Sequence, residues 1–292
     1  MWFATVVVFS LSRAAGDPRH MFVSEYSTHE HWEQWGKNLG LDRPYPMQYL
    51  IWLRGAVKLN FGKSLWYHEE PIRIIAKRWV PTVQLTIGAY FFLILTGVSL
   101  GIWSAVARGT RLDIFGRSFA LVGQATPDFW FGIMAILIFS VYLGWLPTSG
   151  LFNPSWKNYV LPSITLGWSP AAGILRLVRS SMLDTLDSEY VKFARAKGVS
   201  KQKVILKHAL RNAAIVPMTY AGILLAAFIT GTVVVENVFS WPGLGRLSLE
   251  AVRNQDFPML SALVLLGTGT FLIVNLIIDV LYRLIDPRIR IN

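Results

Sequence analysis

The chain has 292 residues, of which 53% are hydrophobic and only 15% are charged, and its formal net charge is +11. This composition is too apolar for an ordinary soluble domain, and the apolar residues cluster in long runs that are typical of membrane proteins. Most Lys and Arg residues flank these runs, so the positive charge does not indicate a nucleic-acid partner. The absence of cysteine excludes a disulfide framework and a cysteine-based metal site.

The N-terminal region divides into a short apolar run and a longer polar segment. Residues 2–11 are apolar but too few to cross about 30 Å of hydrocarbon as a helix, and no signal-peptide pattern is present. We therefore interpret residues 1–13 as part of a truncated first transmembrane helix, with Met1 inside it. Residues 14–79 carry scattered tryptophans and a short amphipathic helix at 49–59, which predicts an extracytoplasmic segment at the membrane surface. A soluble minidomain is the alternative.

Five longer apolar runs follow, each long enough to cross a bilayer as a helix. They lie at about 80–107, 119–142, 160–183, 213–235 and 259–285. With the partial first helix, they predict an all-α polytopic membrane protein of six transmembrane helices. Its permease core would span 80–285, followed by a tail at 286–292.

The positive charges are distributed unevenly between the two sides of these helices. Thirteen Lys and Arg lie in the turn at 108–117, in the segment at 188–212 and near the C-terminus, against three in the short loops of the other side. The positive-inside rule therefore predicts that segment 188–212 and both termini are cytoplasmic.

The most basic stretch, 188–212, is predicted to form two short helices joined by a tight turn. Ser188 and Ser200 are suited to cap them, and Gly198 supplies the left-handed residue that ends the first. One broad apolar face is expected on the second helix, made by Val204, Ile205, Leu206, Ala209 and Leu210. The positive-inside rule explains the charge but not the turn, so we interpret the stretch as a rigid elbow that protrudes into water.

This elbow also resembles a known family. The sequence ARAKG at 194–198, followed by HALRN at 208–212, is similar to the EAA loop of binding-protein-dependent ABC transporter permeases, and most of all to the oligopeptide/dipeptide/nickel branch. In that family the loop docks into a groove on a cytoplasmic ATPase, so Ala194 and Ala196 are expected where the elbow enters that groove. The resemblance implies coupling roles for Glu189, Ala194, Arg195, Ala196, Lys197, Gly198 and His208. The family's Glu-Ala-Ala opening reads Lys-Phe-Ala here, so only its second alanine is kept.

Two other stretches resemble the same family. The sequence ENVFSWPGLG at 236–245 is similar to a signature that, in the family, helps to form the outer gate; this implies gate roles for Glu236, Phe239, Pro242, Gly243 and Gly245. Its Trp-Pro-Gly is expected to make a tight turn at the outer interface, where Trp241 is alternatively an aromatic-belt anchor. Asn275 and Asp279 match a second family stretch and fall one helical turn apart. An intramembrane Asp indicates function by default, although packing and pairing with Arg283 are the plainer alternative.

The remaining polar residues and helix breakers have plain explanations. Asp128 is expected at the interface, near the cytoplasmic start of its span, rather than in a proton relay. Glycines within the spans are attributed to tight helix packing, with hinges as the alternative, and Pro162, Pro170 and Pro217 are expected near helix ends. No catalytic motif is recognisable, and the pair His29 and His31 is weak evidence for a metal, so neither a catalytic nor a metal site is expected.

The resemblance extends from Arg13 to the C-terminal DPRIR. It implies the transmembrane domain of a type I (MetI-like) ABC importer, in the plasma membrane of a prokaryotic cell. The implied partners are a second homologous permease, two cytoplasmic ATPase subunits, an extracytoplasmic solute-binding protein and membrane lipid. No cofactor is expected on this chain, since ATP and Mg²⁺ are used by the ATPases.

Peptides are the main solutes of this branch, with nickel, opines and sugars left open. Two other classes of function are alternatives. An ion-coupled secondary transporter would need paired intramembrane acids or inverted repeats, and we see neither. A membrane scaffold that recruits a cytoplasmic protein through the elbow is the second alternative.

Overall fold

The computed structural model describes residues 2–14, 29–38, 40–148, 150 and 155–285. The described residues are mostly helical and include no strand. They fall into two compact units, one made of residues 1–80 and 247–272 and the other of residues 81–246 and 273–292. The expected tail at 286–292 lies outside the described residues.

The first unit begins with three short helices, α1 (Trp2–Ala14), α2 (His29–Asn38) and α3 (Tyr45–Val57). The amphipathic helix expected at 49–59 is α3, which begins earlier because Pro46 suits the first turn of a helix. It packs on α1, where the hydroxyls of Thr5 and Tyr49 are 2.8 Å apart and the ring of Phe9 meets Tyr49 edge-on at 5.5 Å.

A helical stretch runs without interruption from Pro71 to Val106, so the expected span at 80–107 begins nine residues early. It consists of α4 (Pro71–Leu93), a π-helical turn η2 (Ile94–Val98) and α5 (Ser99–Val106). A Cβ on Gly97 would lie 2.8 Å from the carbonyl oxygen of Ala171, and one on Gly101 would lie 2.7 Å from Val178. Tight packing is therefore confirmed as the reason for these two glycines.

The span expected as one helix at 119–142 is broken. It consists of α6 (Arg111–Ala125), α7 (Asp128–Ala135) and the π-helical η3 (Ile136–Tyr142), and the helices on either side of the break differ in direction by 104°. Thr126 has φ −90° and ψ 120°, because the ring of the following Pro127 excludes the α conformation there. The prediction of one continuous helix was wrong for this reason.

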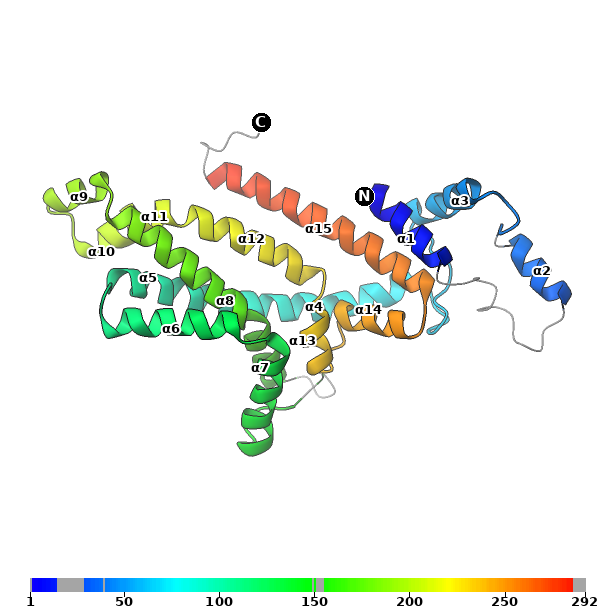
Figure 1. Cartoon of the computed structure of the whole chain (residues 1–292), viewed down its shortest axis with the longest axis horizontal. Coiled ribbons are helices and arrows are strands. Elements are labelled where there is room, and N and C mark those ends of the chain that lie inside the picture. Colours follow the sequence, from blue (N-terminus) through cyan, green and yellow to red (C-terminus); the bar gives the residue numbers. More distant parts are fainter. Residues whose placement is uncertain (1, 15–28, 39, 149, 151–154, 286–292) are drawn as a thin grey trace. The chain divides into compact units, whose positions relative to one another are not determined.

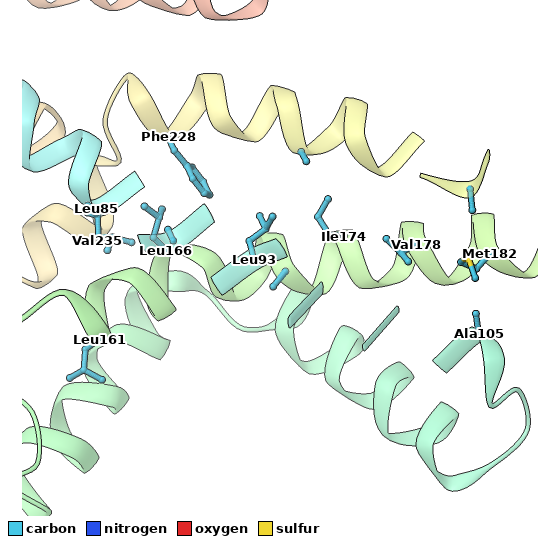
Figure 2. Packing of buried hydrophobic residues seen from close by; sticks show 14 of the residues in the cluster. Leu85, Leu93, Ala105, Leu161, Leu166, Ile174, Val178, Met182, Phe228 and Val235 are labelled. Atoms are coloured by element: carbon cyan, nitrogen blue, oxygen red, sulfur yellow. The ribbon is translucent and has the colours of Figure 1, made fainter. Parts of the chain in front are cut away.

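The central helix of the second unit is α8 (Trp156–Leu186), which packs against α5, α6, α7 and α12 (Ile215–Ile229) (Figure 1). Ser155 and Asn158 form a capping box at its start. Figure 2 shows the core that follows from this arrangement, with Leu93, Ile174 and Phe228 among the side chains gathered along α8. Pro162 and Pro170 lie inside α8, so their expected places near helix ends were wrong.

The rest of the chain is also helical. The elbow contains α9 (Glu189–Ala196), α10 (Lys201–Lys203), the π-helical η4 (Val204–Ala209) and α11 (Leu210–Ala213), and it is followed by α12 (Ile215–Ile229), α13 (Val233–Val238), α14 (Leu244–Arg253) and α15 (Phe257–Ile285). The expected span at 213–235 is interrupted after Ile229, since Gly231 adopts a φ of +102° that a right-handed helix cannot contain.

Two described stretches are long and apolar enough to cross a membrane, Pro71–Val106 and Phe257–Val280. The number rises to four if two bent helix pairs, at 111–142 and 201–229, each count as one span. Six transmembrane helices therefore remain a prediction.

Candidate functional site

The turn of the elbow depends on Gly198. This residue has a φ of +78°, while a Cβ placed on it would meet nothing within 4 Å. Glycine is therefore favoured by its positive φ, as the sequence predicted, and not by a lack of room for a side chain. Ser188 and Ser200 do precede the helices, but neither side chain caps one; the Ser188 hydroxyl donates instead to the carbonyl of Thr185.

Small apolar side chains hold the two halves of the elbow together. Val191 and Ala194 of α9 are buried, as are Val204 and Ala209 of η4. Ala194 therefore packs inside the elbow, and its expected place at the entrance to a partner's groove stays a prediction. Leu206 was expected on the apolar face but is exposed. The i→i+5 bonding of a π-helix brings residues five apart, such as 204 and 209, onto one side, and Leu206 then lies on another.

The outer side of α9 carries two exposed aromatic residues. Tyr190 and Phe193 line a shallow surface depression together with Glu189, Lys192 and Ala196. The Tyr190 hydroxyl donates to the carbonyl oxygen of His208 at 3.3 Å and accepts from the Asn212 amide at 2.9 Å, which ties α9 to the second half of the elbow.

The charged residues of the elbow lie on different sides of α9. Glu189 pairs with Lys192 at 2.8 Å, and the Lys197 ammonium lies 4.6 Å from the centre of the Phe193 ring. Arg195 borders a separate cavity, described below. Of the residues expected to couple the permease to its ATPase, only Glu189 and Ala196 line the depression. Lys197 lies over the Phe193 ring at its edge.

A buried ion pair joins α6 to α8, the helix that leads into the elbow. Asp113 of α6 receives two hydrogen bonds from Arg179 of α8, from Nε at 2.8 Å and from Nη2 at 3.1 Å. The Ser104 hydroxyl donates to the same carboxylate at 2.7 Å, and so does the Gly109 amide at 3.1 Å. The sequence reading missed this cluster, although an arginine inside an expected span is itself a signal.

The carboxylate of Glu236 is fully buried among hydrogen-bond donors. The Thr82 hydroxyl donates to one oxygen at 3.1 Å, and the Arg246 amide donates to the other at 2.9 Å. Further bonds come from the backbone of Thr232 and Gly245. Burial raises the pKa of the Glu236 carboxyl above its ordinary value, and the hydrogen bonds oppose that rise.

The rest of this signature packs around Glu236. The expected tight turn is present, since the Gly243 amide donates to the Trp241 carbonyl at 2.9 Å. Trp241 is completely buried and its indole donates to the Pro81 carbonyl at 2.9 Å, so the aromatic-belt interpretation was wrong. Phe239 is buried as well, and a Cβ on Gly243 would lie 2.5 Å from the Glu236 carboxyl group.

The expected intramembrane polar pair lies on the last helix, α15. Asn275 and Asp279 lie one turn apart on α15, and Asp279 is exposed. The side chain of Arg283 lies outside the described residues. Asp128 is the first residue of α7, next to the break, and one of its carboxylate oxygens is buried without a hydrogen-bond partner among the described residues.

In the first unit, Asp256 joins segments that are far apart in the sequence. It caps α15 by accepting from the Met259 amide at 3.1 Å, and its second oxygen accepts from the Ser64 hydroxyl and from the Trp66 amide at 3.3 Å. The sequence reading treated 60–64 only as a turn and missed this contact.

Replacing Asp256 by Ala is expected to lower the free energy of unfolding by about 2 kcal/mol, because a helix cap is lost and buried donors lose their acceptor. Asp256→Asn, which keeps one acceptor oxygen, should cost less. Thermal unfolding of the purified protein in detergent would measure both. Equal losses for the two variants would contradict the assignment of the cap.

Comparison with known proteins places these features in a family. Residues 97–291 match the model for the binding-protein-dependent transport system inner membrane component. The chain is 39% identical over 287 residues to the glutathione transport system permease protein GsiC of Salmonella paratyphi A, covering 98% of this chain and 93% of that protein. It is also 39% identical over 291 residues to GsiC of Escherichia coli K12, covering 99% and 94%.

The fold agrees with this placement. The structure resembles a chain of the inward-facing MetNI methionine ABC transporter with a TM-score of 0.62 at 17% identity, over 74% of this chain and 97% of that one. A second MetNI crystal form gives 0.60 at 18% identity. The fold is that of a type I ABC importer transmembrane domain.

Half or more of the chain matches the family model, and nearly all of it aligns with the permease relatives. Members of this family are membrane-embedded transport subunits and not enzymes, and they work in a complex with an ATPase, which hydrolyses ATP, and a binding protein. The chain therefore belongs to the family of binding-protein-dependent transport system inner membrane components, and it is a permease subunit of an ATP-binding-cassette importer.

Proposed function

We propose that the exposed face of α9, made by Glu189, Tyr190, Lys192, Phe193 and Ala196, is the surface by which the permease receives the motion of its ATPase. The observation that carries this proposal is the presence of two exposed aromatic side chains on a short helix that is held by its own buried core. Aromatic residues commonly anchor protein interfaces, and the rim of this face is charged. A solvated loop without a partner would gain nothing from exposing the side chains of Tyr190 and Phe193.

A force on this face would move several helices together. The buried residues of the elbow make α9 and η4 one body, and α9 follows α8 after only two residues. The ion pair between Asp113 and Arg179 then joins α8 to α6. ATP-driven closure of the partner would in this way reorient α6 and α8 and change the side of the membrane to which the pathway opens.

The rest of the assembly is proposed on the same basis. A single chain offers one elbow, so we propose a second, similar permease and two ATPase subunits that together provide two docking grooves. The elbow and both termini lie in the cytoplasm under the positive-inside rule. This chain carries no cofactor of its own, while ATP and Mg²⁺ are bound by the ATPases.

The solute is proposed to be a small peptide or a peptide-like compound such as glutathione, delivered by the binding protein. The relatives named as glutathione permeases align over nearly the whole chain, which supports this class. Uptake of glutathione and of a tripeptide by vesicles that contain the whole complex would test it. The class would be wrong if ATP drove uptake of neither solute while still driving uptake of another, such as nickel.

Replacing Phe193 by Ser is expected to weaken association with the ATPase by about 30-fold, because an aromatic side chain that becomes buried on docking contributes about 2 kcal/mol or more to binding. Leu206→Ser is the matched control, since Leu206 is 60% exposed and Phe193 is 62% exposed, and both lie in the elbow. Co-purification in mild detergent and ATP-dependent uptake are the measurements. Equal loss in both variants, or in neither, would show that docking does not depend on the exposed face of α9.

A further inference from the structure

A cavity of about 430 Å³ lies between the elbow and the helix ends beneath it. Its lining consists of Val106, Leu186, Val199, Val204 and Ile205 together with Arg195 and Lys201. Five aliphatic side chains thus form the walls, while the two cations, which are both exposed, lie at the mouth. The volume falls in the range of small-molecule sites, roughly 300–1,000 Å³.

Among the described residues, no ion pair compensates the positive charge at the mouth of the cavity. No acidic residue is among the described side chains that line it. Asp187, which directly follows the lining residue Leu186, is paired with Arg108 at 3.3 Å. A ligand that fits must therefore bring negative charge to Arg195 and Lys201 and an apolar body to the walls.

The position of the cavity indicates which ligand meets both demands. Val106 is the last residue of the helical stretch Pro71–Val106, which is long and apolar enough to cross a membrane, so the cavity lies at the end of a candidate transmembrane helix. Basic pockets at the cytoplasmic ends of transmembrane helices bind the headgroups of anionic lipids. The ATPase is a less suitable occupant, because Arg195 lies two residues from Phe193 on α9 and so points to nearly the opposite side of the helix.

We propose that this cavity binds an anionic phospholipid, with the phosphate between Arg195 and Lys201 and the glycerol and first acyl carbons against Val199, Val204 and Ile205. The inference rests on the cytoplasmic orientation of the elbow proposed above. A lipid held here would join the elbow to the ends of α5 and α8. The contact of the elbow with its ATPase would then depend on the content of anionic lipid in the membrane.

Lipid binding by the purified permease complex tests this site. The complex, in neutral detergent, is titrated with phosphatidylglycerol or with phosphatidylethanolamine, and the bound lipids are counted by native mass spectrometry. Lys201→Gln is expected to weaken phosphatidylglycerol binding about five-fold, the loss of about 1 kcal/mol for one cation near an anionic headgroup. Ile205→Trp, which fills the cavity and keeps its charge, should weaken binding as well. Lys203→Gln is the matched control, because Lys203 is exposed on the same short helix and does not line the cavity.

Several outcomes would overturn the proposal. One is equal binding by the Lys201→Gln and Lys203→Gln variants, and another is equal binding of the two lipids by the unchanged protein. Displacement of the lipid by millimolar inorganic phosphate would indicate a site for free anions instead. Loss of ATPase association in Lys201→Gln with unchanged lipid binding would assign the cavity to the ATPase. Counting lipids requires neither uptake nor hydrolysis, so failure of the proposed transport function would leave this result intact.

Discussion

Replacing Arg179 by Met is expected to lower the free energy of unfolding by about 3 kcal/mol, because the buried carboxylate of Asp113 loses its two guanidinium bonds. It then keeps two neutral donors and the exposed Arg117, whose Nε lies 3.7 Å away. The Asp113 side chain is 3% exposed and that of Arg179 is 22% exposed, so water cannot replace the two guanidinium bonds fully. Urea or thermal unfolding of the purified protein in detergent would measure the loss. Transport should fall as well, since α6 and α8 would no longer move together.

The matched control is the exposed pair between Arg108 and Asp187, which also joins the start of the α6 region to the end of α8. Its two side chains are 66% and 73% exposed, so Arg108→Gln should change stability by less than about 1 kcal/mol. If Arg179→Met and Arg108→Gln had equal effects, the buried pair would not join these helices. A double variant that removes both Asp113 and Arg179 should be less unstable than the sum of the single ones.

Local sequence chemistry predicted the parts of the elbow that depend on neighbouring residues. Gly198 was predicted to have a positive φ because helix C-termini favour glycine, and the structure confirms it. The break at Thr126 and Pro127 follows from equally local chemistry, yet the long apolar run that surrounds it predicted one helix. In that stretch, hydropathy was given more weight than the steric restriction on the residue before proline.

Contacts between distant segments could not be predicted from a single sequence. The two partners of the buried ion pair are 66 residues apart, and Ser64 and Asp256 are 192 residues apart. The π-helical turn η4, which leaves Leu206 exposed, has no recognised signature in composition or periodicity. Family resemblance identified the signature at 236–245, but it did not show that this stretch packs around the buried carboxylate of Glu236.

The buried carboxylate of Glu236 is the basis of the second large expected effect on stability. Glu236→Ala should lower the free energy of unfolding by about 3 kcal/mol or more, because it leaves the Arg246 amide and the Thr82 hydroxyl buried without their acceptor. Gly243→Ala should cost about 2–3 kcal/mol, since its new methyl group would lie 2.5 Å from the Glu236 carboxyl and one of the two must shift. Gly267→Ala is the matched control, because a Cβ there meets nothing within 4 Å. Unfolding in detergent would rank the three, and if Gly243→Ala proved as stable as Gly267→Ala, the close packing of the glycine against the glutamate would be refuted.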